Sequence, residues 1–183
     1  MNKQAEQIIL VNPQDKKLGF IEKLTAHRFG MLHRAFSVFI FRIRNHRLEV
    51  LLQQRSKAKY HGGGLWTNTC CSHPHPKEKI KQSAERRLFD EMGIHAKLKY
   101  LDKFHYIAKF NNGMTENEID HVFVGDYNND KININPNEVE SYKWVTIPQL
   151  ERGLSTRQKM YTPWLQQALT IAIQEYPAKL IRR

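Results

Sequence analysis

Two short segments of the chain carry residue types that could transfer protons. Residues 66–74 read Trp-Thr-Asn-Thr-Cys-Cys-Ser-His-Pro, which places a thiol and an imidazole within one short stretch. About 45 residues later, Glu116 and Glu118 flank one asparagine. Residues two apart in a strand point to the same face, so these carboxylates can converge on one site. Two upstream histidines, His27 and His33, could complete a metal shell beside the proton-transfer groups.

The length and composition indicate one domain in a reducing compartment. A chain of 183 residues with 40% hydrophobic content fits a single globular domain, here residues 1–183. No apolar run approaches the roughly 20 residues needed to cross a bilayer, and the first residues lack the apolar core of a secretory signal. Cys70 and Cys71 are adjacent, and sequence neighbours rarely form a disulfide because its geometry is strained. We therefore expect a cytoplasmic protein with no membrane partner. The oligomeric state is left open, with a monomer favoured.

The formal net charge of +11 is compatible with two kinds of partner. A nucleic acid and a phosphorylated small molecule would each match its sign. The positive residues are spread along the chain, without a basic tail or a Gly/aromatic RNA-binding signature. Many such charges are merely solvated surface residues, so the net charge alone does not identify the partner. Because the nucleic-acid signatures are missing, we expect no nucleic-acid partner.

Apolar patterns predict strands and helices without strict βαβ alternation. Residues 35–41 read as a buried strand and residues 48–53 as its hairpin partner across residues 44–46. This order favours an α/β (α+β) protein in which a mixed β-sheet is sandwiched between helices. The other expected elements are strands near 98–109, 118–127 and 141–145, a loop at 57–68, a short helix at 147–151, and a last helix from Pro163 to about residue 176.

A helix expected at residues 77–92 carries charged residues of interest. Apolar residues recur every four positions along it, and Gly93 ends the pattern. Arg87 and Glu91 lie four apart and share a face. The ordinary interpretation is a solvated ion pair worth a few tenths of a kcal/mol.

The same helix resembles the Nudix box, the signature segment of the Nudix family. The matching residues are Glu78, Arg86, Leu88, Asp90, Glu91, Gly93 and Ile94. Ser72 stands where the box opens with glycine, and Arg87 replaces the first glutamate of its Arg-Glu pair. Pyrophosphohydrolases use that carboxylate cluster to hold Mg²⁺ around a diphosphate, so a guanidinium there removes a metal ligand. The resemblance therefore implies a Nudix fold and argues against hydrolysis.

Taken with this box, residues 66–74 and the later Glu-Asn-Glu resemble type 1 isopentenyl-diphosphate isomerases. The resemblance covers most of the chain, from residues 22–27 to residues 162–164. The motifs are short, but their order and spacing together make the match specific. It implies that isopentenyl and dimethylallyl diphosphate are interconverted for isoprenoid biosynthesis by protonation at one carbon and deprotonation at another, through a tertiary carbocation.

The resemblance also implies a role for each candidate residue of the reaction. Glu118, with Tyr106 as a relay, would protonate the alkene, and Cys71 would remove the second proton; the direction stays open because the reaction is reversible. The indole of Trp164 would stabilise the carbocation through its π-cloud. A divalent metal, Mn²⁺ with Zn²⁺ or Mg²⁺ as alternatives, would be held by His27, His33, His73, Glu116 and Glu118.

The remaining implied residues would bind the diphosphate, and segment 1–30 would supply ligands to it and to the metal. The positions that match the family's phosphate ligands are Lys23, Arg55, Lys59 and Arg87. A Mg²⁺ ion would bridge the substrate diphosphate to Glu91 and the Cys71 carbonyl. The net charge would then attract the anionic substrate.

Two other functions compete with this one. The first is a Nudix pyrophosphohydrolase of nucleoside diphosphate derivatives, which the arginine at position 87 disfavours. The second is a non-catalytic basic module that holds structural zinc. Its ligands would be Cys70, Cys71, His73 and His75, which are crowded instead of paired as in a zinc finger.

Overall fold

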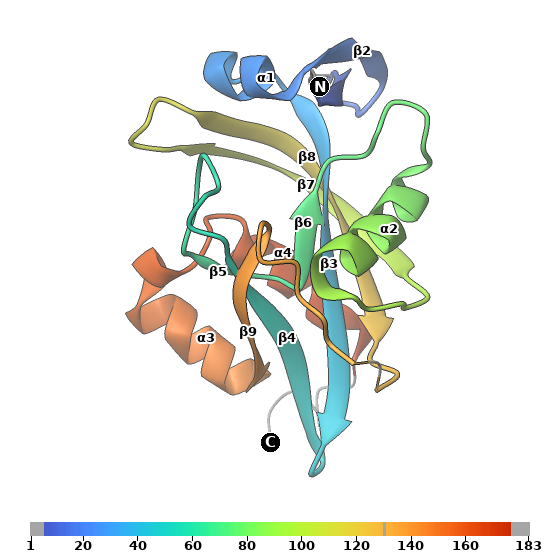
Figure 1. Ribbon diagram of the computed structural model, residues 1–183, viewed down its shortest axis with the longest axis vertical. Coiled ribbons are helices and arrows are strands. Elements are labelled where there is room, and N and C mark those ends of the chain that lie inside the picture. Colours follow the sequence, from blue (N-terminus) through green and yellow to red (C-terminus); the bar gives the residue numbers. More distant parts are fainter. Residues whose placement is uncertain (1–5, 130, 177–183) are drawn as a thin grey trace.

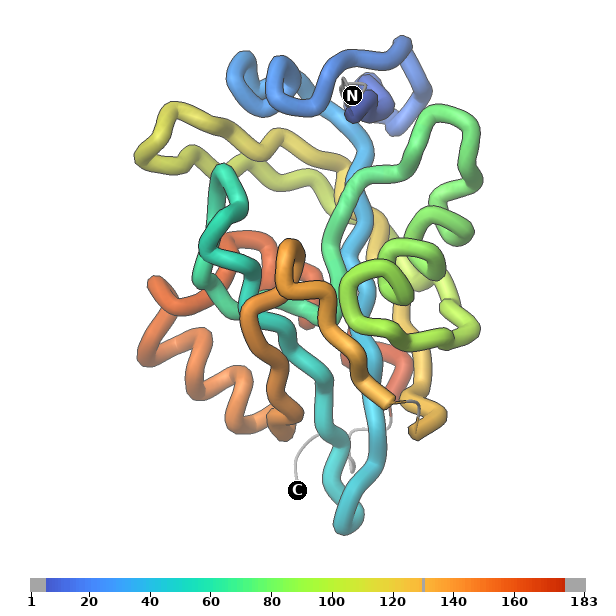
Figure 2. Tube along the Cα trace, viewed as in Figure 1, coloured from blue at the N-terminus to red at the C-terminus, as the bar shows by residue number. Residues whose placement is uncertain are grey.

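The computed structural model describes residues 6–129 and 131–176. Within them, the strands of one sheet lie between helices. One long central strand runs along most of the length of the molecule (Figures 1 and 2). The strands are β1 (Gln7–Val11), β2 (Lys17–Glu22), β3 (His33–Arg44), β4 (Arg47–Arg55), β5 (Trp66–Thr67), β6 (Cys70–Ser72), β7 (Lys99–Lys109), β8 (Thr115–Asp126) and β9 (Val139–Thr146). The helices are α1 (Lys23–Phe29), α2 (Ile80–Met92), α3 (Ile147–Thr156) and α4 (Leu165–Ala172), with 3₁₀ turns at Gln158–Met160 and Ile173–Glu175.

Strand β3 forms the centre of the sheet. It makes the expected hairpin with β4, and Asn45 and His46 adopt φ values of 50° and 59° that a tight two-residue turn requires. On its other side β3 pairs in parallel with β8, which places His33 opposite Glu118. The β3–β4, β4–β9 and β7–β8 pairs are antiparallel. The expected mixed sheet between helices is confirmed.

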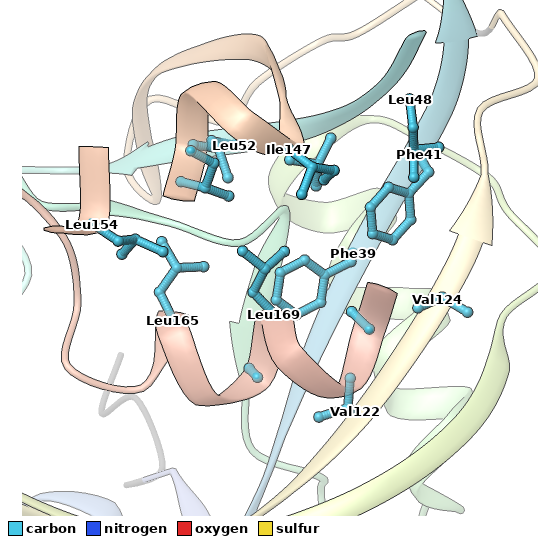
Figure 3. Packing of buried hydrophobic residues seen from close by; sticks show 14 of the residues in the cluster. Phe39, Phe41, Leu48, Leu52, Val122, Val124, Ile147, Leu154, Leu165 and Leu169 are labelled. Atoms are coloured by element: carbon cyan, nitrogen blue, oxygen red, sulfur yellow. The ribbon is translucent and has the colours of Figure 1, made fainter. Parts of the chain in front are cut away.

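Alternation along β3 separates two hydrophobic cores. Phe39 and Phe41 face α3 and α4, as Figure 3 shows, whereas Phe36, Val38 and Ile40 face α2. These side chains are completely buried, and each stabilises the fold by about 2–3 kcal/mol relative to an exposed position. The sheet is therefore held rigidly from both faces, and it can fix side chains at one of its ends.

Helix α2 ends as the sequence predicts but starts later. Gly93 caps it with φ of 68°, and a Cβ there would lie 2.9 Å from Cβ of Asn133. The helix begins at Ile80 instead of residue 77, because Glu78 lies in the preceding turn and binds the guanidinium of Arg86 at 2.9 Å. Glu78, the first matching residue of the box, therefore contacts the side of α2 instead of extending the helix.

The N-terminal strands β1 and β2 and helix α1 were not expected from the pattern. Strand β2 is a poorly buried edge strand whose Leu18 is 69% exposed, so it lacks a clean apolar alternation. Other expected bounds were wrong in detail. The loop at 57–68 contains the short strand β5, α3 continues to Thr156, and the last helix gives way to a 3₁₀ turn after Ala172. Among the described residues, no helix is both long and apolar enough to span a bilayer.

Candidate active site

A cavity of about 310 Å³ lies where β3, β6, β7 and β8 approach α1 and the first turns of α2. It brings together most of the residues that the sequence analysis singled out. Those that line it are Lys23, Arg55, Lys59, Cys71, His73, Arg87, Tyr106, Glu116, Glu118 and Trp164. His27, His33 and Glu91 are buried directly behind this lining.

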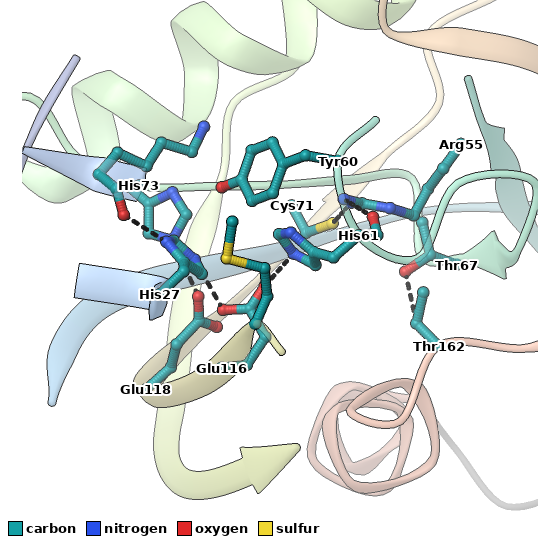
Figure 4. A network of polar contacts seen from close by, with 12 residues as sticks. His27, Arg55, Tyr60, His61, Thr67, Cys71, His73, Glu116, Glu118 and Thr162 are labelled. Atoms are coloured by element: carbon teal, nitrogen blue, oxygen red, sulfur yellow. Dashed lines mark hydrogen bonds and ion pairs between the residues drawn. The ribbon is translucent and has the colours of Figure 1, made fainter. Parts of the chain in front are cut away.

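Three histidines and two glutamates converge at one end of the cavity (Figure 4). One potential ligand atom from each of His27, His33, His73, Glu116 and Glu118 lies within 4.8 Å of all the others. Their parent segments are far apart in sequence, but the parallel pairing of β3 with β8 and the adjacent strand β6 bring them together. The two carboxylates occupy alternate positions of β8 and face the same side, as expected from their spacing.

The hydrogen bonds of two histidines fix which nitrogen faces the cluster. His27 Nδ1 donates to the Lys23 carbonyl at 2.6 Å, and His33 Nδ1 donates to the Met31 carbonyl at 2.7 Å. Carbonyl oxygens only accept, so Nδ1 of each ring carries its hydrogen, and in the neutral form of the ring the lone pair of Nε2 faces the carboxylates. This second contact is the usual way in which proteins orient histidine ligands of a metal.

The atoms at the centre of the cluster lack hydrogen-bond partners. His27 Nε2 and Glu116 Oε2 are both buried and without a hydrogen bond, although they lie 3.0 Å apart. Two facing lone pairs repel unless a cation lies between them. Donor separations of 2.8–3.2 Å recur among His33, His73 and Glu118. Two ligands at right angles on one ion, with bonds of about 2.1 Å, are separated by about 3 Å, so the residues fit a divalent metal.

Charge states in the cluster also suit a metal. Burial lowers the pKa of His73 to about 4, which keeps the ring neutral and able to bind a metal. Burial raises the pKa of Glu116, but its contacts with His27 and His61 outweigh this effect and hold the pKa well below its usual value. Burial and the neighbouring Glu116 raise the pKa of Glu118, and contacts with His33 and His73 reverse the shift. Both carboxylates are therefore ionised.

The two adjacent cysteines point to opposite sides of β6. Cys70 is completely buried in the core that contains α2. Cys71 faces the cavity, where its Sγ accepts a hydrogen bond from Arg55 Nη1 at 3.3 Å. The cysteines thus cannot share a ligand, and the alternative of a zinc site on Cys70, Cys71, His73 and His75 is wrong. Among the described residues, the side chains that could hold a metal together are these histidines and glutamates, and no cysteine belongs to their group.

Cys71 is expected to react slowly with iodoacetamide in chelator-treated protein. Burial raises the pKa of this thiol to about 12 in spite of the neighbouring Arg55. Only the thiolate reacts, so the alkylation rate should rise about tenfold per pH unit between pH 7 and 10. A Cys70→Ala variant isolates the Cys71 signal in mass spectrometry. A rate that levels off near pH 8.5, as for a free cysteine, would contradict the prediction.

Tyr106 and Trp164 also line the cavity. The Tyr106 hydroxyl donates to Glu118 Oε2, and burial raises its pKa well above the usual value, so the phenol keeps its proton. The indole of Trp164 lies 5.8 Å from the Tyr106 ring, centroid to centroid. Its Nε1 donates to Asn68 Oδ1 at 3.2 Å. Asn68 also donates to the Cys70 carbonyl at 2.6 Å, so the Trp-Thr-Asn motif fixes the indole relative to the cysteine strand.

Three cations also line the cavity. Lys23, Lys59 and Arg87 reach it from α1, the loop after β4, and α2. Each is paired with an acidic residue that the sequence analysis missed. Lys23 Nζ lies 3.0 Å from Glu6, Arg87 lies 3.1 Å from Glu138, and Lys59 contacts Glu138. An anionic ligand could replace these exchangeable carboxylates, which come from segments without a recognisable motif.

Glu91 lies beside Arg87 and is only 3% exposed. Its two oxygens accept hydrogen bonds from Arg87 Nη2 at 2.7 Å and Gln53 Nε2 at 2.8 Å. The interpretation of Arg87 and Glu91 as a solvated surface pair is therefore wrong, because the contact is buried. Other lining residues that the sequence analysis missed are Tyr60, His61, Asp120 and Glu138. The sequence Tyr60-His61 immediately before three glycines could have indicated that this loop contributes side chains to the site.

Comparison with known proteins identifies the fold class first. The NUDIX domain model matches residues 31–165, so the chain has a Nudix domain. A crystallised protein of Deinococcus radiodurans is similar with a TM-score of 0.72 and 15% identity, over 91% of this chain and 99% of that one. The NUDIX domain of Shewanella oneidensis NrtR, solved with ADP ribose, has a TM-score of 0.60 and 16% identity, over 79% and 86%. These two likenesses concern the fold alone.

Curated relatives place the chain within that class. An isopentenyl-diphosphate Delta-isomerase of Photobacterium profundum is 45% identical over 173 residues, 93% of this chain and 96% of the relative. Isopentenyl-diphosphate Delta-isomerase 2 of Aromatoleum aromaticum is 44% identical over 160 residues, 87% and 82%. The chain belongs to the isopentenyl-diphosphate Delta-isomerase family.

Proposed function

We propose that this enzyme interconverts isopentenyl and dimethylallyl diphosphate. The observation that carries the proposal is the composition of the cavity. A cluster of metal ligands, a thiol and a tyrosine-bound carboxylate line it together with cations from three elements. An allylic diphosphate needs both sets of groups, because it has a reacting hydrocarbon part and an anionic part. The relatives' names describe this substrate and this reaction.

Two proton-transfer groups on different walls suit an allylic shift. Protonation at the terminal carbon of isopentenyl diphosphate gives a tertiary carbocation, and loss of a proton from the neighbouring methylene gives the product. Glu118, in hydrogen-bonded contact with Tyr106, would handle the first proton. Cys71 would handle the second. The two groups reach the cavity from β6 and β8, so an alkene bound between them would meet a proton-transfer group from each strand.

The protonation states of Cys71 and Glu118 before substrate binds determine which direction of the isomerisation they can start. The raised pKa leaves a proton on Cys71, whereas Glu118 is ionised. This arrangement starts the conversion of dimethylallyl to isopentenyl diphosphate, with Cys71 as the acid and Glu118 as the base. The conversion of isopentenyl to dimethylallyl diphosphate would begin with this proton on the Glu118–Tyr106 pair and with Cys71 as the thiolate. The pair thus carries one proton in both directions, as reversibility requires.

The surroundings stabilise positive charge and hold the substrate. The π-face of Trp164 would stabilise the carbocation, and its bond to Asn68 fixes the ring. A divalent metal, Mn²⁺ with Zn²⁺ or Mg²⁺ as alternatives, would be held by the histidine–glutamate cluster and would make a proton near Glu118 more acidic. Lys23, Arg55, Lys59 and Arg87 would bind the diphosphate. Mg²⁺ carried by the diphosphate would use Glu91 and the Cys71 carbonyl as ligands once Arg87 turns to the substrate.

The function is tested by following the purified enzyme with isopentenyl diphosphate in D₂O. With Mn²⁺ and Mg²⁺ present, NMR should show dimethylallyl diphosphate accumulating and deuterium entering both positions that exchange protons. A panel of nucleoside diphosphate derivatives serves as the comparison, because Arg87 replaces a hydrolase carboxylate. Phosphate release from that panel without any allylic product would favour the hydrolase alternative and overturn the proposal.

A reducing compartment forms part of the proposal. Both cysteines are free thiols, and the reaction needs Cys71 reduced. We therefore place the enzyme in the cytoplasm, acting on its small diphosphate substrate as a monomer without nucleic-acid or membrane partners.

A further inference from the structure

His61 is a fourth histidine at the metal cluster that the resemblance does not assign. It lies in the loop after β4, two residues beyond Lys59, and is only 6% exposed. Its ring stacks on that of His27 with centroids 5.2 Å apart and an interplanar angle of 29°. Tyr60 and Phe110 pack against other sides of the ring at 4.4 and 5.0 Å. The imidazole is therefore held in one orientation.

The ring of His61 contacts a metal-cluster carboxylate on its outer side. His61 Nε2 contacts Oε1 of Glu116, whereas Oε2 of the same carboxylate faces His27 at 3.0 Å and His33 at 3.9 Å. His61 is not part of the group whose donor atoms all lie within 4.8 Å of one another. Figure 4 shows it approaching Glu116 from the side of Cys71 and Arg55. The two oxygens of Glu116 thus have separate partners.

The hydrogen bonds of the two histidines give them opposite roles toward Glu116. His27 donates from Nδ1 to a carbonyl, which leaves a lone pair on Nε2. His61 Nδ1 is buried and has no hydrogen-bond partner, so no contact requires its hydrogen there. A carboxylate oxygen needs a donor, and the neutral ring supplies one when the hydrogen is on Nε2. His27 can therefore present a lone pair to a metal, while Nε2–H of His61 can donate to the carboxylate.

We propose that His61 is a positioning residue of the metal centre, which binds Glu116 Oε1 so that Oε2 alone is presented to the metal. This inference rests on the proposed metal-dependent function. Groups that hydrogen-bond metal ligands from outside typically change metal affinity by about 10–100-fold when removed.

The loop that carries His61 also ties the metal centre to the rest of the site. The His61 carbonyl accepts a hydrogen bond from Arg55 Nη2 at 3.2 Å, and Arg55 donates to Cys71 Sγ. The loop is tightly folded here, because a Cβ on Gly63 would lie 3.0 Å from the Lys57 carbonyl. One short segment thus fixes the orientation of Glu116 and, through Arg55, the surroundings of the thiol.

The test measures metal binding by the full chain without any substrate. Equilibrium dialysis with Mn²⁺ and titration with Co²⁺ would compare wild type with His61→Ala and His61→Gln. Glutamine can place an amide N–H near the position of Nε2, so it should retain most of the affinity. His61→Ala should bind Mn²⁺ about 10–100-fold more weakly, whereas His61→Gln should keep the absorption spectrum of wild type at Co²⁺ saturation. His95→Gln is the matched control, because His95 stacks on Phe89 at the end of α2, away from the cluster.

Three other results of the binding measurements would overturn the proposal, each in a distinguishable way. Unchanged affinity in His61→Ala shows that the contact does not position Glu116. A changed spectrum at Co²⁺ saturation in His61→Gln shows that His61 binds the metal directly. Loss of affinity in both variants, with an equal drop in the melting temperature of the metal-free proteins, shows a purely structural role. Wild type that binds metal normally but does not isomerise its substrate contradicts the proposed function alone, whereas wild type that binds no metal contradicts both.

Discussion

Cys71→Ala is expected to lower kcat for isopentenyl diphosphate by at least about 10³-fold, because it removes one of the two proton-transfer groups. The loss corresponds to about 4 kcal/mol of transition-state stabilisation. The KM should change little, because the cations that would bind the diphosphate belong to other residues. Steady-state kinetics at several substrate concentrations separates the two constants.

The chain offers its own control for this substitution. Cys70 is adjacent, of identical chemistry, and turned into the core. Cys70→Ala should cost some stability through lost packing but leave kcat within a few-fold of wild type. Full activity in Cys71→Ala, or equal losses in both variants, would mean that the thiol transfers no proton.

Removal of the metal is expected to abolish turnover and to lower the melting temperature. Chelator-treated protein should lose activity to background and regain it with Mn²⁺, because the five ligands converge on one buried position. At a free metal concentration of 100 times the Kd, binding stabilises the fold by about 2.7 kcal/mol. In a chain of this size that corresponds to roughly 5–10 °C in Tm.

Two measurements make the metal result specific. Without substrate, dialysis should show one tightly bound equivalent, since the second ion is expected to arrive with the diphosphate. Restoring the chelated protein with Ca²⁺ is the control, because Ca²⁺ prefers oxygen ligands to a shell with three imidazoles. Turnover that persists in metal-free protein would argue against the role of the cluster.

Much of the site could be predicted because its residues lie in short motifs with local geometry. Glu116 and Glu118 share a face for the simple reason that they are two apart on a strand. The alternation of Cys70 and Cys71 on β6 follows the same rule. The central hairpin could also be predicted, since two apolar runs flank the short polar segment 44–46. The structure shows the positive φ angles of this turn.

The residues that were missed depend on contacts between distant segments. His61 lies in a loop whose path depends on three glycines, and its partner Glu116 is 55 residues away. Glu138 gives no motif, because its role is to neutralise Arg87 and Lys59 from the far side of the cavity. The edge strand β2 is only partly buried, so its sequence lacks the periodicity on which strand prediction depends.

The manner in which the N-terminal segment joins the sheet has a consequence for its stability. Strand β1 meets β3 at the single pair Leu10 and His33, and a small apolar cluster with Ile119 supports it. Asp15 adds ion pairs with Arg34, Lys103 and His121, and the ring of His27 reaches across to Glu116. Metal occupancy and local unfolding of residues 6–30 are therefore linked. A metal bound by His27 and Glu116 would cross-link this segment to β8, and its loss would favour local unfolding of the segment and expose the Lys23 side of the cavity to water.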